Sequence, residues 1–256
     1  MSRFLLLPVV SFSVLVGALA CGGGGDGEDG SSACSVLKIA GGESCEVGPS
    51  AVAVVASDIG YCSGVFVTTR HVLTAAHCIP RGVREIGVAS AGFRATTRSA
   101  RVHPLYDGSI SSPFDVAVVS VNEDAPVQPV PLMVSRAVTP GDRVAVYGFG
   151  LDEDGNDVVD RVESGQSALK ATFLRVSSVD PGTIGSVSEG GDTCQGDSGG
   201  SLLLAGSDGQ PGVVAIVRAG PELCVPESPF PSENSNVQSQ QVVDFIRASA
   251  PGTRFN

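Results

Sequence analysis

GGDTCQGDSGG, residues 190–200, is the most informative segment of this chain. Glycines stand on both sides of Ser198, so the backbone can make a tight turn there and point its N–H groups into a cavity. Such N–H groups suit the binding of a developing oxyanion next to a nucleophile. A glycine-rich turn alone is a weak signal, and the hypothesis needs a base elsewhere in the chain.

LTAAHC, residues 73–78, offers that base. The chain contains three histidines, and His77 follows a run of small and apolar residues at the end of an expected strand. At such a place an imidazole can be held firmly and still be reached by a substrate. Taken alone, the segment would fit a buried structural histidine equally well.

SPFDVAVV, residues 112–119, places one carboxylate at the mouth of a valine-rich strand. A buried aspartate at that position needs a polar partner. Asp115 could simply cap the strand or a turn. With His77 as its partner, it would instead fix the imidazole tautomer and stabilise the imidazolium ion.

Composition favours an all-β fold and excludes one class of partner. The chain has 256 residues, of which 42% are hydrophobic, enough to bury a core. It has 33 glycines, 16 prolines and no tryptophan, which is typical of short strands joined by many turns. Acidic residues outnumber basic ones by 27 to 16 and no Lys/Arg block occurs, so nucleic-acid binding is excluded.

Together, LTAAHC, FDVAVV and DTCQGDSGG resemble, in the same order, the motifs of the trypsin-like serine endopeptidases. The resemblance covers residues 39–256. Gly148-Phe149-Gly150 is similar to the family's Gly-Trp-Gly strand end, and Val242 to Arg247 is similar to its closing helix. The resemblance implies a chymotrypsin-like fold: two packed six-stranded antiparallel β-barrels and a short C-terminal helix.

Carried over residue by residue, the resemblance gives each motif a role. Ser198 would be the nucleophile, His77 the general base and then acid, and Asp115 the residue that orients His77. The backbone N–H groups of Gly196 and Ser198 would form the oxyanion hole. The implied enzyme hydrolyses protein or peptide substrates through an acyl-enzyme, as a monomer, with no cofactor or metal.

Two other functional classes compete with this interpretation. A protease-like fold could keep these residues without activity and serve as a binding protein at the cell surface. An esterase of the α/β-hydrolase type is disfavoured because the residues occur here in the order His, Asp, Ser.

Specificity is suggested by Asp192, which matches the family position at the base of the primary specificity pocket. A carboxylate there implies cleavage after Lys or Arg, because a neutral side chain would leave it buried and unpaired. Residues 212–217, aligned with the family's substrate-binding strand, place Ala215, Ile216 and Val217 where Ser, Trp and Gly are usual. We therefore expect Ala215 and Val217 to alter the pocket walls.

Lys38-Ile39-Ala40-Gly41-Gly42 is similar to the family's activation site. The resemblance implies a zymogen in which cleavage after Lys38 frees the amino group of Ile39. That ammonium would pair with Asp197, which otherwise is a buried charge lacking a partner.

The chain has seven cysteines, and an even six remain when Cys21 is set apart. An even number suits disulfide pairing, which indicates an oxidising compartment. No CxxC pair occurs, so a structural zinc site is not expected. The resemblance implies two disulfides, Cys62–Cys78 and Cys194–Cys224. Cys34 and Cys45 remain and are expected to pair with each other.

The N-terminus is interpreted as an export signal over residues 1–20. Ala18-Leu19-Ala20-Cys21 resembles a bacterial lipobox, so Cys21 would carry a lipid that attaches the protein to a membrane of the cell envelope. Residues 21–38 would then form a glycine-rich tether and activation segment ahead of the protease domain, residues 39–256. Ordinary secretion is the alternative.

An acidic stretch, Asp152 to Glu163, has side chains at calcium-loop spacing. The glycine expected at the sixth position is Asp157, so a solvated acidic loop is favoured.

Overall fold

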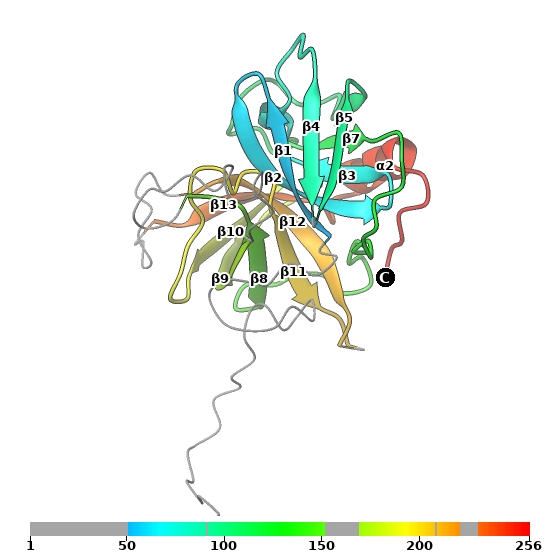
Figure 1. Ribbon diagram of the computed structural model, residues 1–256. Helices are drawn as coiled ribbons and strands as arrows, with labels where there is room; N and C mark the ends of the chain where they lie inside the picture. The colour runs from blue at the N-terminus through cyan, green and yellow to red at the C-terminus, as the bar shows by residue number, and fades with distance from the viewer. Residues whose placement is uncertain (1–50, 91, 152–168, 208, 221–229) are drawn as a thin grey trace, which may run out of the picture. The chain divides into compact units, whose positions relative to one another are not determined.

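The computed structural model describes residues 51–90, 92–151, 169–207, 209–220 and 230–256. Within these ranges, strands predominate and one α-helix lies near the C-terminus, so the expected all-β class is confirmed (Figure 1). The following predicted features lie outside the described residues: the signal peptide 1–20, Cys21 and the tether, Cys34, Lys38, Ile39, Cys45, the Asp152 to Glu163 stretch and Cys224.

The first sheet has seven antiparallel strands in the order β5-β4-β1-β2-β3-β7-β6. Valine occurs in every one of these strands except β5, because β-branched side chains fit a pleated, buried surface. The strands are β1 (Val52–Ser57), β2 (Gly60–Thr68), β3 (His71–Thr74), β4 (Ile86–Ser90), β5 (Phe93–Thr97), β6 (Ala100–Val102) and β7 (Ala117–Ser120).

The seven strands match the six-stranded barrel that the sequence predicts, with one strand broken. The two edge strands, β5 and β6, are consecutive in the chain and separated only by Arg98 and Ser99. The backbone oxygen of Ser99 accepts a hydrogen bond from the Ser120 N–H at 2.8 Å. Residues 93–102 therefore act as one bent strand that joins both edges of the sheet.

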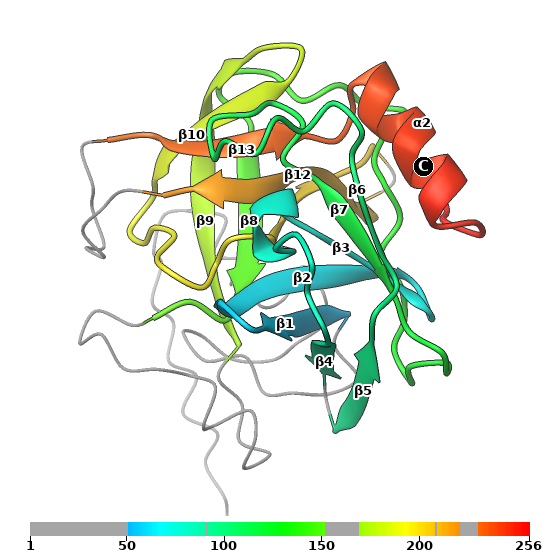
Figure 2. The same ribbon diagram turned by 90° about the horizontal axis from the view of Figure 1, so that it is seen from above.

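The second sheet is a closed six-stranded barrel in the order β10-β13-β12-β11-β8-β9, as predicted. Seen from above, these strands lie on one side and β1, β2, β4 and β5 on the other (Figure 2). The strands are β8 (Arg143–Gly148), β9 (Lys170–Val179), β10 (Thr183–Ser188), β11 (Ser201–Ala205), β12 (Pro211–Ala219) and β13 (Ser232–Asn236).

Strand β2 packs its apolar side chains into the first core and forms hydrogen bonds to the second barrel. It is buried from Cys62 to Val67 without alternation, unlike a strand with one face in water. Phe66 and Val65 belong to the first core, with zero exposure. The Ser63 side chain is equally buried, but it bonds to the second barrel, at Phe149 and Gly196.

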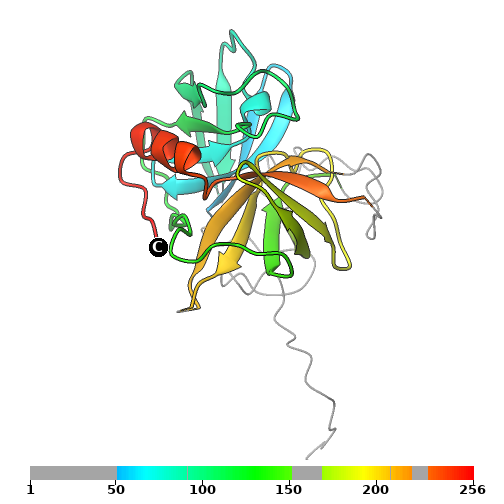
Figure 3. The same ribbon diagram turned by 180° about the vertical axis from the view of Figure 1, so that it is seen from behind.

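The predicted C-terminal helix is α2 (Gln240–Ser249), which follows β13 yet lies beside the first barrel (Figure 3). Its apolar stripe is Val242, Val243 and Ile246, at the spacing that buries one helix face. No helix among the described residues is long and apolar enough to cross a membrane.

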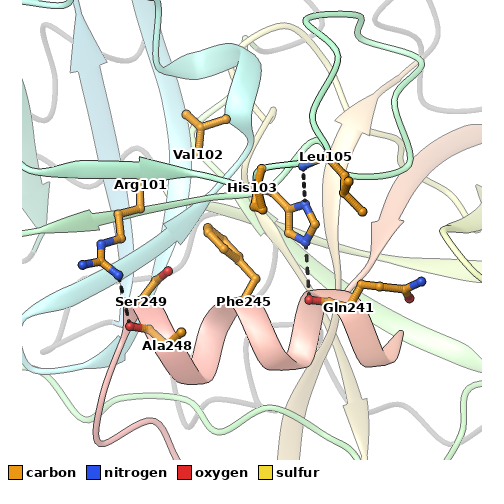
Figure 4. Close-up of a pocket in the computed structure, with 9 residues that line it drawn as sticks. Arg101, Val102, His103, Leu105, Gln241, Phe245, Ala248 and Ser249 are labelled. Atoms are coloured by element: carbon orange, nitrogen blue, oxygen red, sulfur yellow. Dashed lines mark hydrogen bonds between the residues drawn. The ribbon is translucent and has the colours of Figure 1, made fainter.

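His103 ties this helix to the first barrel (Figure 4). Its ring stacks on Phe114 at a centroid distance of 4.8 Å and meets the edge of Phe245 at the same distance. Nδ1 accepts the Leu105 N–H at 3.2 Å, so Nε2 carries the proton and donates to the backbone oxygen of Gln241 at 3.4 Å. His103 is thus a neutral, structural histidine, and burial lowers its pKa.

Candidate active site

His77 and Asp115 are joined by two hydrogen bonds. His77 lies in the 3₁₀ turn η2 (Ala76–Cys78), directly after β3, and its Nδ1 is 2.6 Å from Asp115 Oδ2. The His77 backbone N–H donates to Asp115 Oδ1 at 2.8 Å. A carboxylate only accepts, so Nδ1 carries the ring proton and Nε2 is left as the basic nitrogen. The Asp115 side chain is fully buried and that of His77 is 23% exposed, so the base is held and reachable.

Asp115 is held in place from the second barrel. Its own N–H donates to the Ser112 oxygen at 3.2 Å, which makes a turn just before β7. Ser235 Oγ in β13 donates to the backbone oxygen of Asp115 at 3.2 Å. Arg218 Nη1 in β12 donates to the Ser112 oxygen at 3.1 Å. The aspartate of the first barrel therefore has its backbone fixed by side chains of the second.

Ser198 lies in a tight turn between β10 and β11. Gly196 and Gly199 flank it with φ of +92° and +83°, the left-handed region that favours glycine. A Cβ on Gly199 would also collide with the Ser63 oxygen and with Thr74 Oγ1. The turn is closed by the Gly200 N–H, which donates to the Asp197 oxygen at 2.7 Å.

The nucleophile turn lies directly against the segment that carries the base. The Ser198 backbone oxygen accepts the Ser63 N–H at 2.8 Å. The same oxygen is 3.9 Å from the sulfur of Cys78, the residue that follows His77. The structure thus brings all three sequence-predicted segments together where the barrels meet.

The predicted Cys62–Cys78 disulfide is present and ties β2 to the turn that carries His77. These two sulfurs and a His77 nitrogen lie within 4.8 Å of one another. Because both sulfurs are in the disulfide, neither is a thiolate, and the cluster is not a metal site. Cys194 is also disulfide-bonded.

Asp192 has one carboxylate oxygen satisfied and one not. Oδ1 accepts the Thr193 N–H at 2.7 Å and the Ser232 hydroxyl at 2.9 Å. Oδ2 is buried and has no hydrogen-bond partner within the described part of the chain. Burial raises the pKa of this carboxyl, against the effect of the hydrogen-bond donors on Thr193 and Ser232. This oxygen is therefore free of any hydrogen-bond donor among the described residues.

The expectation that Ala215 and Val217 form pocket walls is not supported. Both are buried in the second core, at 0% and 1% exposure. Strand β12 is fixed by the Gly199 N–H, which donates to the Val217 oxygen at 2.8 Å, and its pairing with β13 shifts between Val217 and Ala219. This register brings Gly220, instead of Val217, against Thr193, next to Asp192.

Asp197 is enclosed beneath the nucleophile turn. Its oxygens accept the Gly150 N–H at 2.7 Å and the Cys194 N–H at 2.8 Å. Burial raises its pKa to about 6, while these donors and the charge of Lys170 act in the opposite direction. Its expected partner, the amino group of Ile39, lies outside the described residues.

Sequence reasoning missed two buried polar residues of the site, Ser63 and Arg218. Ser63 is fully buried and Arg218 is 2% exposed. The signal for Ser63 is a small polar residue in an apolar strand, directly after Cys62. The signal for Arg218 is a charge in the otherwise apolar β12, where it pairs with Glu233.

Comparisons of the sequence with known proteins point to one family. The family model described as "Trypsin" matches residues 39–242. A trypsin of Saccharopolyspora erythraea is 28% identical over 216 residues, covering 71% of this chain and 94% of that protein. Trypsin I-P1 of Gallus gallus is 29% identical over 189 residues, covering 66% of this chain and 75% of that protein. The serine protease Hayan of Drosophila melanogaster is 29% identical, covering 62% of this chain and 30% of that protein.

Proposed function

The chain belongs to the trypsin family of serine proteases, and from this premise we propose that it is an active serine endopeptidase. His77, Asp115 and Ser198 would be its catalytic residues. The observation that carries the proposal is the pair of hydrogen bonds by which buried Asp115 fixes His77 while Nε2 stays available. A scaffold retained only for binding has no need of a base held in this tautomer and open to solvent.

The first half of the reaction forms an ester on Ser198. His77 Nε2 takes the Ser198 hydroxyl proton as Oγ attacks the scissile carbonyl carbon. The carbonyl oxygen becomes an oxyanion that accepts hydrogen bonds from the backbone N–H groups of Gly196 and Ser198. The C–N bond then breaks, and His77 passes its proton to the departing amine. Asp115 stabilises the imidazolium ion in between.

Water completes the reaction by the same steps. His77 takes a proton from a water molecule as the oxygen of that water attacks the ester carbon. The Ser198 oxygen then leaves and regains the proton from His77, which releases a carboxylic acid. No step needs a group beyond the chain, its substrate and water.

We further propose cleavage after Lys or Arg. The support is Asp192 Oδ2, buried beside Thr193 and Ser232 without a hydrogen-bond partner among the described residues. An ammonium or guanidinium group would pair with this oxygen, whereas a neutral side chain would leave it unpaired.

Activation would follow cleavage after Lys38. The support is the enclosed Asp197 carboxylate, which accepts the backbone N–H groups of Cys194 and Gly150 and whose raised pKa reflects the cost of its burial. The freed Ile39 ammonium would supply the opposite charge. Lys38 is itself a residue of the type that Asp192 would select, so the enzyme would activate its own zymogen.

Export and lipid attachment are proposed on the sequence of residues 1–21 alone. The mature monomer would stay attached to the cell envelope through a lipid on Cys21, and a Cys34–Cys45 disulfide would keep the cleaved domain on its tether. Replacement of Cys21 by serine should then move the protein from the membrane fraction to the soluble one.

Mass spectrometry after exposure to a fluorophosphonate tests the proposed activity. The chain cleaved after Lys38 should gain one label on Ser198. A His77→Ala variant and the uncleaved chain should stay unlabelled over the same time. Absence of the label in folded, cleaved protein would favour the inactive binding protein. Equal labelling of uncleaved and cleaved chains would refute the activation proposal alone.

A further inference from the structure

Ser63, in β2, makes four hydrogen bonds at the junction of the two barrels. It has no exposed surface. Its backbone N–H donates to the Ser198 oxygen at 2.8 Å, and its backbone oxygen accepts the Thr74 hydroxyl at 2.7 Å. Its own hydroxyl donates to the Gly196 oxygen at 2.9 Å and accepts the Phe149 N–H at 2.8 Å.

Two of these bonds hold carbonyl groups of the nucleophile turn itself. Gly196 and Ser198 are the residues whose N–H groups would form the oxyanion hole, and the oxygens of both are bound to Ser63. The bond to Ser198 uses a backbone N–H, which any residue but proline provides. The bond to Gly196 uses the hydroxyl, which only serine or threonine provides in this geometry.

We propose that the Ser63 hydroxyl is a positioning group for the oxyanion hole, an inference that rests on the proposed function. Gly196 has a φ of +92° and no side chain, so its peptide units rotate easily unless they are bound. Each peptide unit is planar, and fixing the Gly196 oxygen fixes the plane that follows this residue. The Gly196 N–H lies in the preceding peptide unit, whose Gln195 oxygen accepts the Leu151 N–H at 2.8 Å. With a bound peptide plane on each side, the dihedral angles of Gly196 are restricted, and its N–H is aimed before substrate arrives, as oxyanion stabilisation requires.

The hydroxyl also couples the turn to the end of β8. Phe149 donates its N–H to Ser63, and the next residue, Gly150, donates its N–H to Asp197. The Gly196 and Asp197 sides of the turn are therefore both bound to the segment Gly148 to Gly150. Removing the Ser63 hydroxyl breaks one of these two connections and leaves the other intact, so the turn would loosen without unfolding.

The experiment compares Ser63→Ala with wild type and with a matched control, Ser90→Ala. Ser90 is also buried in the first barrel, and its hydroxyl donates to a backbone oxygen, that of Val52, at 2.8 Å. All chains are cleaved after Lys38. Three quantities are measured: the rate of fluorophosphonate labelling of Ser198, kcat and KM for a peptide amide, and the thermal unfolding midpoint.

Ser63→Ala should label Ser198 about tenfold more slowly, the effect of one neutral hydrogen bond, and lower kcat by a similar factor with KM nearly unchanged. The largest loss expected is the one caused by removing an oxyanion donor altogether, which lowers kcat about 10²- to 10³-fold. Ser90→Ala should lose stability and keep the wild-type labelling rate. Ser63→Gly also lacks the hydroxyl and cannot clash, so it decides the matter if Ser63→Ala does not fold.

A folded Ser63 variant that labels and turns over at the wild-type rate would overturn the inference. Slow labelling of Ser198 in the Ser90→Ala chain would also overturn it, because loss of stability alone would then slow the reaction. If the wild-type chain is not labelled, the proposed function itself fails, which is a different result from equal rates in wild type and variant.

Discussion

Replacing Asp115 by asparagine should inactivate the enzyme while preserving its shape. Two donors meet this side chain: the His77 backbone N–H at 2.8 Å and the ring Nδ1 at 2.6 Å. Asparagine has one acceptor, and the backbone donor cannot change, so the asparagine oxygen should stay with it. The side-chain NH₂ then faces Nδ1, which has to become an acceptor.

The imidazole would then carry its proton on Nε2, where it can no longer accept one from Ser198. In the worked serine-protease case this wrong tautomer lowers kcat about 10⁴-fold, or about 5.5 kcal/mol at about 1.4 kcal/mol per decade. We expect the same order here, measured as kcat for a peptide amide and as the rate of fluorophosphonate labelling. Thermal unfolding should change little by comparison, since size and burial are kept.

Asp124→Asn is the matched control for this variant. Asp124 pairs with Arg70 on the surface, where both side chains are more than half exposed. Such a pair contributes little, and the control should keep wild-type activity. If the kcat of Asp115→Asn stays within about tenfold of wild type, the tautomer of His77 does not limit the reaction and the role proposed for Asp115 is wrong.

Three further predictions concern specificity, pH and the disulfide. Asp192→Ser should lower kcat/KM for Lys and Arg substrates by about 10²- to 10³-fold, since it removes the carboxylate proposed to pair with the substrate cation. Cleavage of a peptide library measures this, and an unchanged preference for Lys and Arg in the variant would show that the prediction is wrong. Burial lowers the pKa of His103, so the stability that depends on its neutral form should be complete above about pH 6.5 and be lost as the pH falls through the folded-state pKa. Thermal unfolding between pH 7 and 5 measures this loss, and His103→Phe should reduce the pH dependence. Replacing Cys62 and Cys78 by serine should lower the free energy of unfolding by about 3 kcal/mol, the value for a loop of 16 residues, as measured by urea titration.

Most of the fold could be predicted because three short motifs are each tied to one place in it. Asp115 bonds to His77, the Ser198 turn bonds to β2 beside them, and the predicted Cys62–Cys78 disulfide is present. The catalytic roles of His77, Asp115 and Ser198 stay predictions. The break in the strand of residues 93–102 was not predicted, because a two-residue corner leaves no distinct pattern.

The pocket walls were assigned wrongly because sequence alone did not give the register of β12. That register depends on a hydrogen bond between Gly199 and Val217 and on a shift in the pairing with β13. Ser63 and Arg218 were missed for a related reason. Their roles come from contacts with residues more than 85 positions away, and no local pattern encodes such a contact.

An active-site titration with a guanidinobenzoate ester measures whether Ser198 is the nucleophile of a working serine endopeptidase. The ester should acylate Ser198 and release its phenol in a burst, because a guanidinium-bearing acyl group leaves the enzyme slowly. We expect about one equivalent of phenol per folded chain cleaved after Lys38, and none from Ser198→Ala. Absence of a burst from folded, cleaved protein, or a burst that survives Ser198→Ala, would contradict this expectation.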